Sequence, residues 1–189
     1  MEKTTGTLVD KMLFLKKFFV SPKKIGSITP SSLYLARAMT ERITWEESNC
    51  VIELGAGTGV FTSYLHEAKP DGCTVLVFEQ DGEMRQRLQS EYANLHFCQN
   101  AEHIHAEMQA AGIRHADYIL SGLPFANFPQ SVRNKILDGV VQTLKPGGQF
   151  IAFQYSLQMK KQLKSRFANI DIKMVPLNIP PAFVYYCQN

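Results

Sequence analysis

A glycine-rich segment between an apolar run and a helical segment is the feature that most constrains how this chain can fold. It reads Glu53-Leu54-Gly55-Ala56-Gly57-Thr58-Gly59, after the apolar run 50–54 and before a helical segment at 60–67. Glycine adopts backbone conformations closed to other residues and puts no Cβ between the backbone and a ligand. The first N–H groups of a helix also lack partners within it. The segment therefore predicts a nucleotide-binding loop, with a glycine-rich turn of no function as the alternative.

Apolar runs and helical segments alternate along the middle of the chain. Strands are expected at 50–54, 74–78, 96–99, 117–120 and 150–155. The clearest helix is 129–144, where apolar residues recur at every fourth position, and Lys145-Pro146-Gly147-Gly148 is expected to end it in a turn. Such alternation predicts a parallel sheet with helices on both faces, which binds ligands at the carboxyl ends of its strands.

The two ends of the chain depart from this alternation. Strands are expected at 170–177 and 182–187, and the four residues between them are too few for a helical crossover, so the pair is predicted to form an antiparallel hairpin. Residues 1–49 are expected to form a helical extension, and residues 50–189 the ligand-binding domain.

Composition narrows the class of protein. With 189 residues, 45% of them hydrophobic, the chain is expected to fold as one domain without disulfides or a metal. Its four cysteines include no Cys-x-x-Cys pair, which argues against a zinc ribbon and favours a reducing cytoplasm. No apolar run approaches the roughly 20 residues of a membrane-spanning helix. The net charge of +3 does not by itself indicate nucleic acid.

The loop differs from a dinucleotide fingerprint. The glycine spacing is G-x-G-x-G, and Val60 stands where that fingerprint has a third small residue. Glu53 would lie unfavourably near a pyrophosphate, but it suits the cationic amino acid end of S-adenosylmethionine. The motif resembles the first motif of the class I S-adenosylmethionine methyltransferases, which include rRNA adenine dimethylases and bacterial phospholipid N-methyltransferases. The expected strands likewise resemble the Rossmann-like, seven-stranded sheet of that class.

The resemblance implies a set of cofactor contacts. Glu79, which ends the second strand, would accept hydrogen bonds from both ribose hydroxyls, whereas Asp81 is better suited to cap the next helix. Asn100 and the Ala101 N–H would contact the adenine, although Asn100 could instead cap a helix. The full expected set is Glu53, Gly55, Ala56, Gly57, Gly59, Glu79, Gln80, Asn100, Ala101 and Ser121. The product would be S-adenosylhomocysteine.

The segment Ser121-Gly122-Leu123-Pro124-Phe125 follows the fourth strand, where the methyl group would point. This segment resembles the Asn-Leu-Pro-Tyr motif of adenine methyltransferases. In that motif the Asn side chain accepts a hydrogen bond from the base amine, and the aromatic ring stacks on the base. Gly122 occupies the Asn position here and supplies no side-chain acceptor, while Phe125 occupies the aromatic position. The Ser121 hydroxyl and the carbonyls around Gly122 and Leu123 are expected to orient the acceptor amine, with Tyr34 closing over the site. His103 and His105 are expected on the surface.

Other segments are similar to the phospholipid N-methyltransferases, namely 14–19, 22–32, 121–125 and 178–184. Apolar residues form one helical stripe over 8–19, and five lysines lie between residues 11 and 24 without an acid. Such a basic amphipathic helix can bind an anionic membrane surface. Packing of this helix against the sheet and binding of RNA by its lysines are the alternatives.

These features predict an enzyme that methylates the amino group of a phosphatidylethanolamine-type lipid, in the cytoplasm at the inner face of the membrane. An rRNA adenine N6-methyltransferase is the second hypothesis, and a non-catalytic cofactor-binding module is the third. The acceptor, the number of methyl groups and the oligomeric state stay open, because one fold hosts many acceptors.

Overall fold

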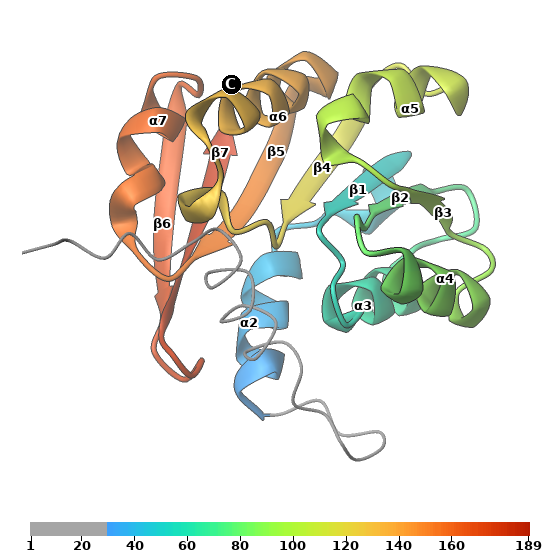
Figure 1. The fold of residues 1–189 in the computed structure, drawn as a ribbon, viewed down its shortest axis with the longest axis horizontal. Coiled ribbons are helices and arrows are strands. Elements are labelled where there is room, and N and C mark those ends of the chain that lie inside the picture. The colour runs from blue at the N-terminus through green and yellow to red at the C-terminus, as the bar shows by residue number, and fades with distance from the viewer. Residues whose placement is uncertain (1–29) are drawn as a thin grey trace, which may run out of the picture.

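A computed structural model describes residues 30–189, which contain a seven-stranded sheet (Figure 1). The strands are β1 (Cys50–Leu54), β2 (Thr74–Phe78), β3 (His96–Cys98), β4 (Ala116–Ser121), β5 (Leu144–Gln154), β6 (Asn169–Val175) and β7 (Ala182–Gln188). They lie in the order β3-β2-β1-β4-β5-β7-β6, and only β7 runs antiparallel to its neighbours. The predicted class, a mostly parallel sheet with a terminal hairpin, is confirmed.

Helices cover both faces of this sheet, so its central strands are buried on both sides. One face packs against α5 (Ile104–Ala110), α6 (Gln130–Thr143) and α7 (Lys160–Lys164), and the other against α2 (Pro30–Thr40), α3 (Val60–Ala68) and α4 (Gly82–Glu91). Short 3₁₀ helices are η1 (Trp45–Glu47), η2 (Ala101–His103), η3 (Phe125–Asn127) and η4 (Leu157–Met159).

The expected turn at Lys145–Gly148 is wrong, because β5 begins directly after α6. The pairing of β4 with β5 shifts here, from Ala116 opposite Leu144 to Tyr118 opposite Gln149. The extra residues form an irregularity within the strand, with Gly147 in a left-handed conformation at φ +77°. Proline and glycine therefore produce a bulge in a strand rather than a loop between two elements.

The predicted C-terminal hairpin is confirmed, but β7 lies between β5 and β6. Consequently β6 runs parallel to β5, and the turn between β6 and β7 projects from the carboxyl edge of the sheet, where the parallel strands end (Figure 1). The Asn178 side chain is buried in this turn and its Nδ2 donates to the Pro180 carbonyl at 2.7 Å. A buried side chain thus fixes the shape of the turn.

Helix α2 packs on the outer strands of the sheet. The Tyr186 hydroxyl donates to the Ala38 carbonyl at 2.7 Å, and Lys173 forms an ion pair with Glu41. Arg42 pairs with Asp171, so the residues that follow α2 lie beside β6. Figure 1 shows that α2 begins at the end of the molecule where the β6–β7 turn lies. The start of α2 therefore lies toward the carboxyl edge. The predicted basic helix of residues 8–24 lies outside the described residues.

Within residues 30–189, no helix has the length and apolar character needed to cross a membrane.

The buried Asp117 carboxylate fixes the start of β1. Its Oδ2 accepts from the N–H groups of Asn49 and Cys50, both at 2.8 Å, and its Oδ1 pairs with Lys145. Burial opposes ionisation, yet the ammonium and the two N–H groups hold the pKa of Asp117 below its ordinary value. The ion pair therefore contributes stability above the ordinary pKa of aspartate and loses it as the pH falls.

We expect Asp117→Ala to lower the free energy of unfolding by about 2–4 kcal/mol at pH 7, because it leaves the buried Cys50 N–H and the Lys145 ammonium without their partner. Asp171→Ala, which removes an exposed partner of Arg42, is the control and should cost less than about 1 kcal/mol. Urea unfolding of both variants measures the difference, and equal losses would contradict this role for Asp117.

Candidate active site

The glycine-rich loop lies at the carboxyl edge, where β1 and β2 end. The N–H groups of Gly55 and Ala56 both donate to the Phe78 carbonyl, at 2.8 and 3.2 Å, which draws the loop against the end of β2. Gly57 has φ +55°, and a Cβ added to it would meet no atom within 4 Å. The backbone of Gly57 therefore faces open space and is accessible to a ligand.

Glu79 ties this loop to the segment after β2. Its Oε2 accepts from the Gly57 N–H at 2.6 Å, and its Oε1 accepts from the Asp81 N–H at 2.8 Å. A carboxylate oxygen can accept more than one hydrogen bond, so both oxygens keep capacity for hydroxyl donors. Asp81 caps α4 by accepting from the N–H groups of Glu83 and Met84, as predicted.

Glu53 is a fully buried carboxyl group at the end of β1. Its Oε2 accepts from the Thr62 hydroxyl at 2.7 Å, while its Oε1 is buried without a hydrogen-bond partner. Burial raises the pKa of Glu53 to about 8, with the nearby Glu79 adding to the rise and the Thr62 hydrogen bond opposing it. An unpaired buried oxygen is costly. The unpaired Glu53 Oε1 would be satisfied by a ligand that places a hydrogen-bond donor or a positive charge beside it.

The other residues expected near the nucleotide lie along the same edge. Asn100 caps η2 by accepting from the Glu102 N–H at 2.9 Å, so its side-chain oxygen serves the helix cap that was the alternative role. Ala101 is buried directly after it, and Gln80 is exposed beside Glu79. The residues predicted to contact the nucleotide therefore lie on loops along one edge of the sheet, and the role of Asn100 stays open.

A pocket of about 190 Å³ opens beside the glycine loop, at the carboxyl ends of β4 and β5. Its lining residues are Gly122, Leu123, Pro124, Ala126, Asn127, Phe153, Gln154, Tyr155, Ser156 and Gln158. Within this lining, the only side chain that can lose a proton is that of Tyr155. Burial raises the pKa of Tyr155, although its hydrogen bond to the Asn178 side chain opposes the rise.

Gly122 joins this pocket to the glycine loop. A Cβ added to it would lie 2.9 Å from the Gly55 carbonyl oxygen, which is backbone and cannot swing away. Its N–H donates to the Leu54 carbonyl at 2.9 Å, so the chain after β4 is held against the end of β1. The Gly122 position therefore admits no side chain, which excludes the asparagine that adenine methyltransferases carry there.

Three expected acceptor residues lie elsewhere than anticipated. The Phe125 ring is 1% exposed and packs edge-on against Phe128 and Phe150, so it belongs to the core rather than to a stacking surface. The Ser121 hydroxyl is buried and accepts from the Leu123 N–H at 3.2 Å, which stabilises the turn after β4. Tyr34 is 49% exposed on α2 and does not line the pocket. Gly122, Leu123 and Pro124 do line it.

Sequence reasoning missed the contribution of β5. Phe153 packs edge-on against Phe61 and Tyr155, and the Gln154 amide donates to the Leu123 carbonyl at 2.9 Å. Gln154 at the end of an apolar run was the signal in the sequence that could have indicated this contribution, because a buried polar group needs a hydrogen-bond partner.

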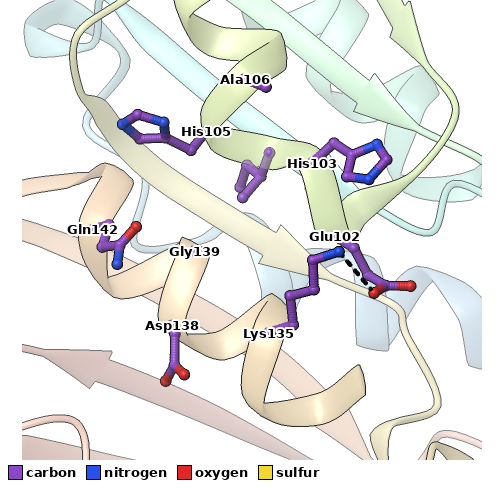
Figure 2. Close-up of a pocket in the computed structure, with 9 residues that line it drawn as sticks. Glu102, His103, His105, Ala106, Lys135, Asp138, Gly139 and Gln142 are labelled. Atoms are coloured by element: carbon purple, nitrogen blue, oxygen red, sulfur yellow. Dashed lines mark ion pairs between the residues drawn. The ribbon is translucent and has the colours of Figure 1, made fainter. Parts of the chain in front are cut away.

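A second depression, of about 380 Å³, lies between α5 and α6 (Figure 2). Lys135 and Glu102 form an ion pair on its wall at 3.3 Å, and His103 and His105 are exposed, as expected. Figure 2 shows their two imidazole rings pointing in opposite directions and Asp138 pointing away from both. Apart from the Lys135–Glu102 pair, the labelled ionisable side chains do not converge, so we assign this depression no part in the site.

Comparisons with known proteins agree with this geometry. Residues 51–148 match a family described as "Methyltransferase domain". The ornithine lipid N-methyltransferase of Singulisphaera acidiphila is 33% identical over 187 residues, which cover 95% of this chain and 96% of that protein.

Solved structures share the fold at lower identity. An O-methyltransferase from Bacillus cereus, in complex with SAH, has a TM-score of 0.66 at 11% identity and covers 98% of this chain and 92% of its own. A 16S rRNA N2 methyltransferase of T. thermophilus, in complex with AdoMet and guanosine, has a TM-score of 0.61 at 23% identity, and the match covers 88% of this chain and 45% of that chain. The family match and the lipid-methylating relative, together with this fold, show that the chain belongs to the class I S-adenosylmethionine-dependent methyltransferases.

Proposed function

We propose that this methyltransferase acts on the primary amine of a membrane lipid, of the phosphatidylethanolamine or ornithine lipid type. The observation that carries the proposal is the pocket at Gly122, which adjoins the glycine loop and offers no carboxylate, imidazole or ammonium in its lining. Such a pocket suits an acceptor that becomes nucleophilic simply by losing its own proton.

We propose the following cofactor contacts. Glu53 would hold the ammonium group of S-adenosylmethionine and Glu79 the ribose hydroxyls, while Gly57 presents its backbone to the ligand. The unpaired Glu53 Oε1 and the open space at Gly57 both fit this arrangement. Asn100 and Ala101, at the end of β3, would border the adenine. The bound cofactor supplies an electrophilic methyl group on a sulfonium.

The acceptor class follows from proton chemistry. An alkyl amine resembles the lysine side chain, with a pKa near 10.4 in water, and desolvation favours its neutral form. The lining of the pocket is mostly apolar, with the rings of Phe153 and Tyr155 in contact, and it supplies such desolvation. The Leu123 carbonyl accepts from the Gln154 amide and from the Phe125 N–H, both at 2.9 Å, so both of its lone pairs are used. The neighbouring Gly122 carbonyl is therefore the group that we propose to orient the amine. Orientation and exclusion of water then provide most of the rate enhancement.

The same pocket disfavours the adenine hypothesis. The Gly55 carbonyl blocks any side-chain acceptor at Gly122, and Phe125 is buried away from the pocket. Both groups that would bind an extruded adenine are therefore missing. The lipid hypothesis is supported by 33% identity, along nearly the whole chain, to a protein named for lipid N-methylation.

The function is tested by incubating the protein with radiolabelled S-adenosylmethionine and one acceptor at a time. We expect label in vesicles of phosphatidylethanolamine or of ornithine lipid. Phosphatidylcholine vesicles are the matched control, because their amine is already fully methylated, and unmodified ribosomal RNA is the competing acceptor. Label that appears only in RNA would overturn the proposal.

The open space at Gly57 predicts a selective effect of substitution. Gly57→Ala should weaken cofactor binding at least tenfold, because the added methyl group occupies the space that faces the ligand, while unfolding becomes easier by only about 1 kcal/mol. Gly112→Ala is the matched control, since Gly112 also has a positive φ (+72°) and open space around it. It should cost similar stability without changing cofactor affinity measured by calorimetry.

The buried Glu53 carboxyl group is predicted to lower the stability of the ligand-free protein and to strengthen cofactor binding. Its pKa is about 8 when folded and near 4.5 when unfolded, so the folded chain holds an extra proton between these values and loses stability as the pH rises through them. Glu53→Gln should therefore raise the melting temperature of the ligand-free protein at pH 8.5 by at least about 3 °C, with little change at pH 4.5.

The same Glu53→Gln variant should bind S-adenosylmethionine at least tenfold more weakly, because it lacks the negative charge proposed to hold the ammonium. Thermal melts across this pH range and calorimetric titration measure the two effects. A variant with native affinity would remove Glu53 from the proposed cofactor site.

A further inference from the structure

Among residues 30–189, the large apolar side chains that are exposed to solvent lie toward one edge of the sheet. They are Leu33, Tyr34, Tyr155, Leu157, Met174, Leu177 and Ile179. Tyr155 and Leu157 follow the carboxyl end of β5, and Met174 and Leu177 flank the end of β6. Leu33 and Tyr34 lie in the first turns of α2, which start toward the same edge (Figure 1). Large apolar side chains gathered on one surface mark an interaction site.

The turn between β6 and β7 is the most prominent part of this surface. Ile179 is 80% exposed and Leu177 58% exposed, on either side of the buried Asn178. The Asn178 side chain is held within the turn by the Pro180 carbonyl. The two aliphatic side chains are therefore presented to solvent by a turn with a fixed shape, which we call the apolar tip (Leu177 and Ile179).

The apolar tip is connected to the acceptor pocket. Asn178 is hydrogen-bonded to the hydroxyl of Tyr155, and Tyr155 lines the pocket and packs edge-on against Phe153. One buried amide thus joins the tip to the pocket wall. A lipid whose acyl chains lie beside the tip would have its headgroup next to the pocket entrance.

Positive charge accompanies the apolar surface. Lys160 and Lys161 are exposed at the start of α7, directly after the 3₁₀ helix η4 that begins with Leu157. Neither takes part in an ion pair within residues 30–189. Arg37 is exposed on α2, one helical turn from Leu33 and Tyr34. Apolar side chains bordered by cations suit the interface of an anionic bilayer, whereas a purely apolar surface would equally suit another protein.

We propose that the apolar tip inserts into the interface of an anionic lipid bilayer and so delivers the lipid headgroup to the pocket at Gly122. This inference rests on the proposed lipid acceptor, and it assigns membrane binding to the β6–β7 turn in addition to any role of residues 1–29. It predicts that the tip matters for lipid in a bilayer and is dispensable for lipid dissolved as monomers.

The test compares two double variants of the full chain. Leu177→Ser with Ile179→Ser removes the apolar tip, and Leu177→Met with Ile179→Met retains apolar side chains as the matched control. Binding to vesicles of phosphatidylethanolamine and phosphatidylglycerol is measured by sedimentation. Methyl transfer is measured on those vesicles and on a short-chain phosphatidylethanolamine below its aggregation concentration.

We expect the serine variant to bind vesicles at least tenfold more weakly and to lose at least tenfold in kcat/KM on vesicles, with kcat/KM on the monomeric lipid unchanged within twofold. The methionine variant should match the native protein on both substrates. Unchanged vesicle binding by the serine variant would overturn the proposal and leave residues 1–29 to account for membrane binding. An equal loss on both substrates would also overturn it, because the tip would then serve the pocket itself.

Fluorescence provides a readout independent of catalysis. Trp45 is the only tryptophan of the chain and lies in η1, just before β1 and so at the opposite edge of the sheet. In vesicles with brominated acyl chains, Ile179→Trp should add a quenched emission, while Trp45 in the native protein stays unquenched. Absence of quenching at position 179 would overturn insertion even if the lipid is methylated.

If the native protein methylates neither lipid, the proposed function fails, and sedimentation and quenching still report on the membrane contact. A dimer that forms in solution and is abolished in the serine variant, without vesicle binding, would instead assign the tip to a second copy of this chain.

Discussion

The close approach of the chain after β1 to the chain after β4 is the constraint on which the site depends. Gly122 has no room for a Cβ because the Gly55 carbonyl lies there, and a Cβ on Gly55 would lie 2.8 Å from the Leu123 side chain. Two glycines thus let the glycine loop and the acceptor pocket share one wall. Methyl transfer needs donor and acceptor in line and close together, and this contact brings the two proposed sites side by side.

The carboxylates at this edge illustrate how a binding site departs from the rules that stabilise the core. Glu53 is buried in a strand whose other residues are apolar, with one oxygen unpaired. Glu79, by contrast, satisfies both oxygens with backbone N–H groups and so holds the loop in shape. Glu79 thus organises the loop and can still accept further hydrogen bonds, whereas Glu53 leaves one buried oxygen unpaired at a cost in stability.

The reversal of β7 has a similar consequence at the acceptor side. Because β7 lies between β5 and β6, the turn that joins β6 to β7 projects beside the end of β5. Tyr155, which lines the pocket, is therefore within hydrogen-bonding reach of Asn178 in the turn that carries the apolar tip, and both residues are far from the glycine loop in sequence. The topology of the sheet thus connects the edge that carries the proposed site to the surface proposed to meet the bilayer.

The sequence by itself determined the alternation of strands and helices, the glycine loop, the terminal hairpin and the cap at Asp81, because periodicity and turn chemistry are local properties. Only the tertiary structure decided that Phe125 enters the core, that β5 starts at Leu144, and that Phe153 and Tyr155 complete the pocket with Gly122. The direction in which a side chain packs, and the partners that it meets, depend on strand register and on contacts between elements distant in the chain. Local sequence carries little of that information.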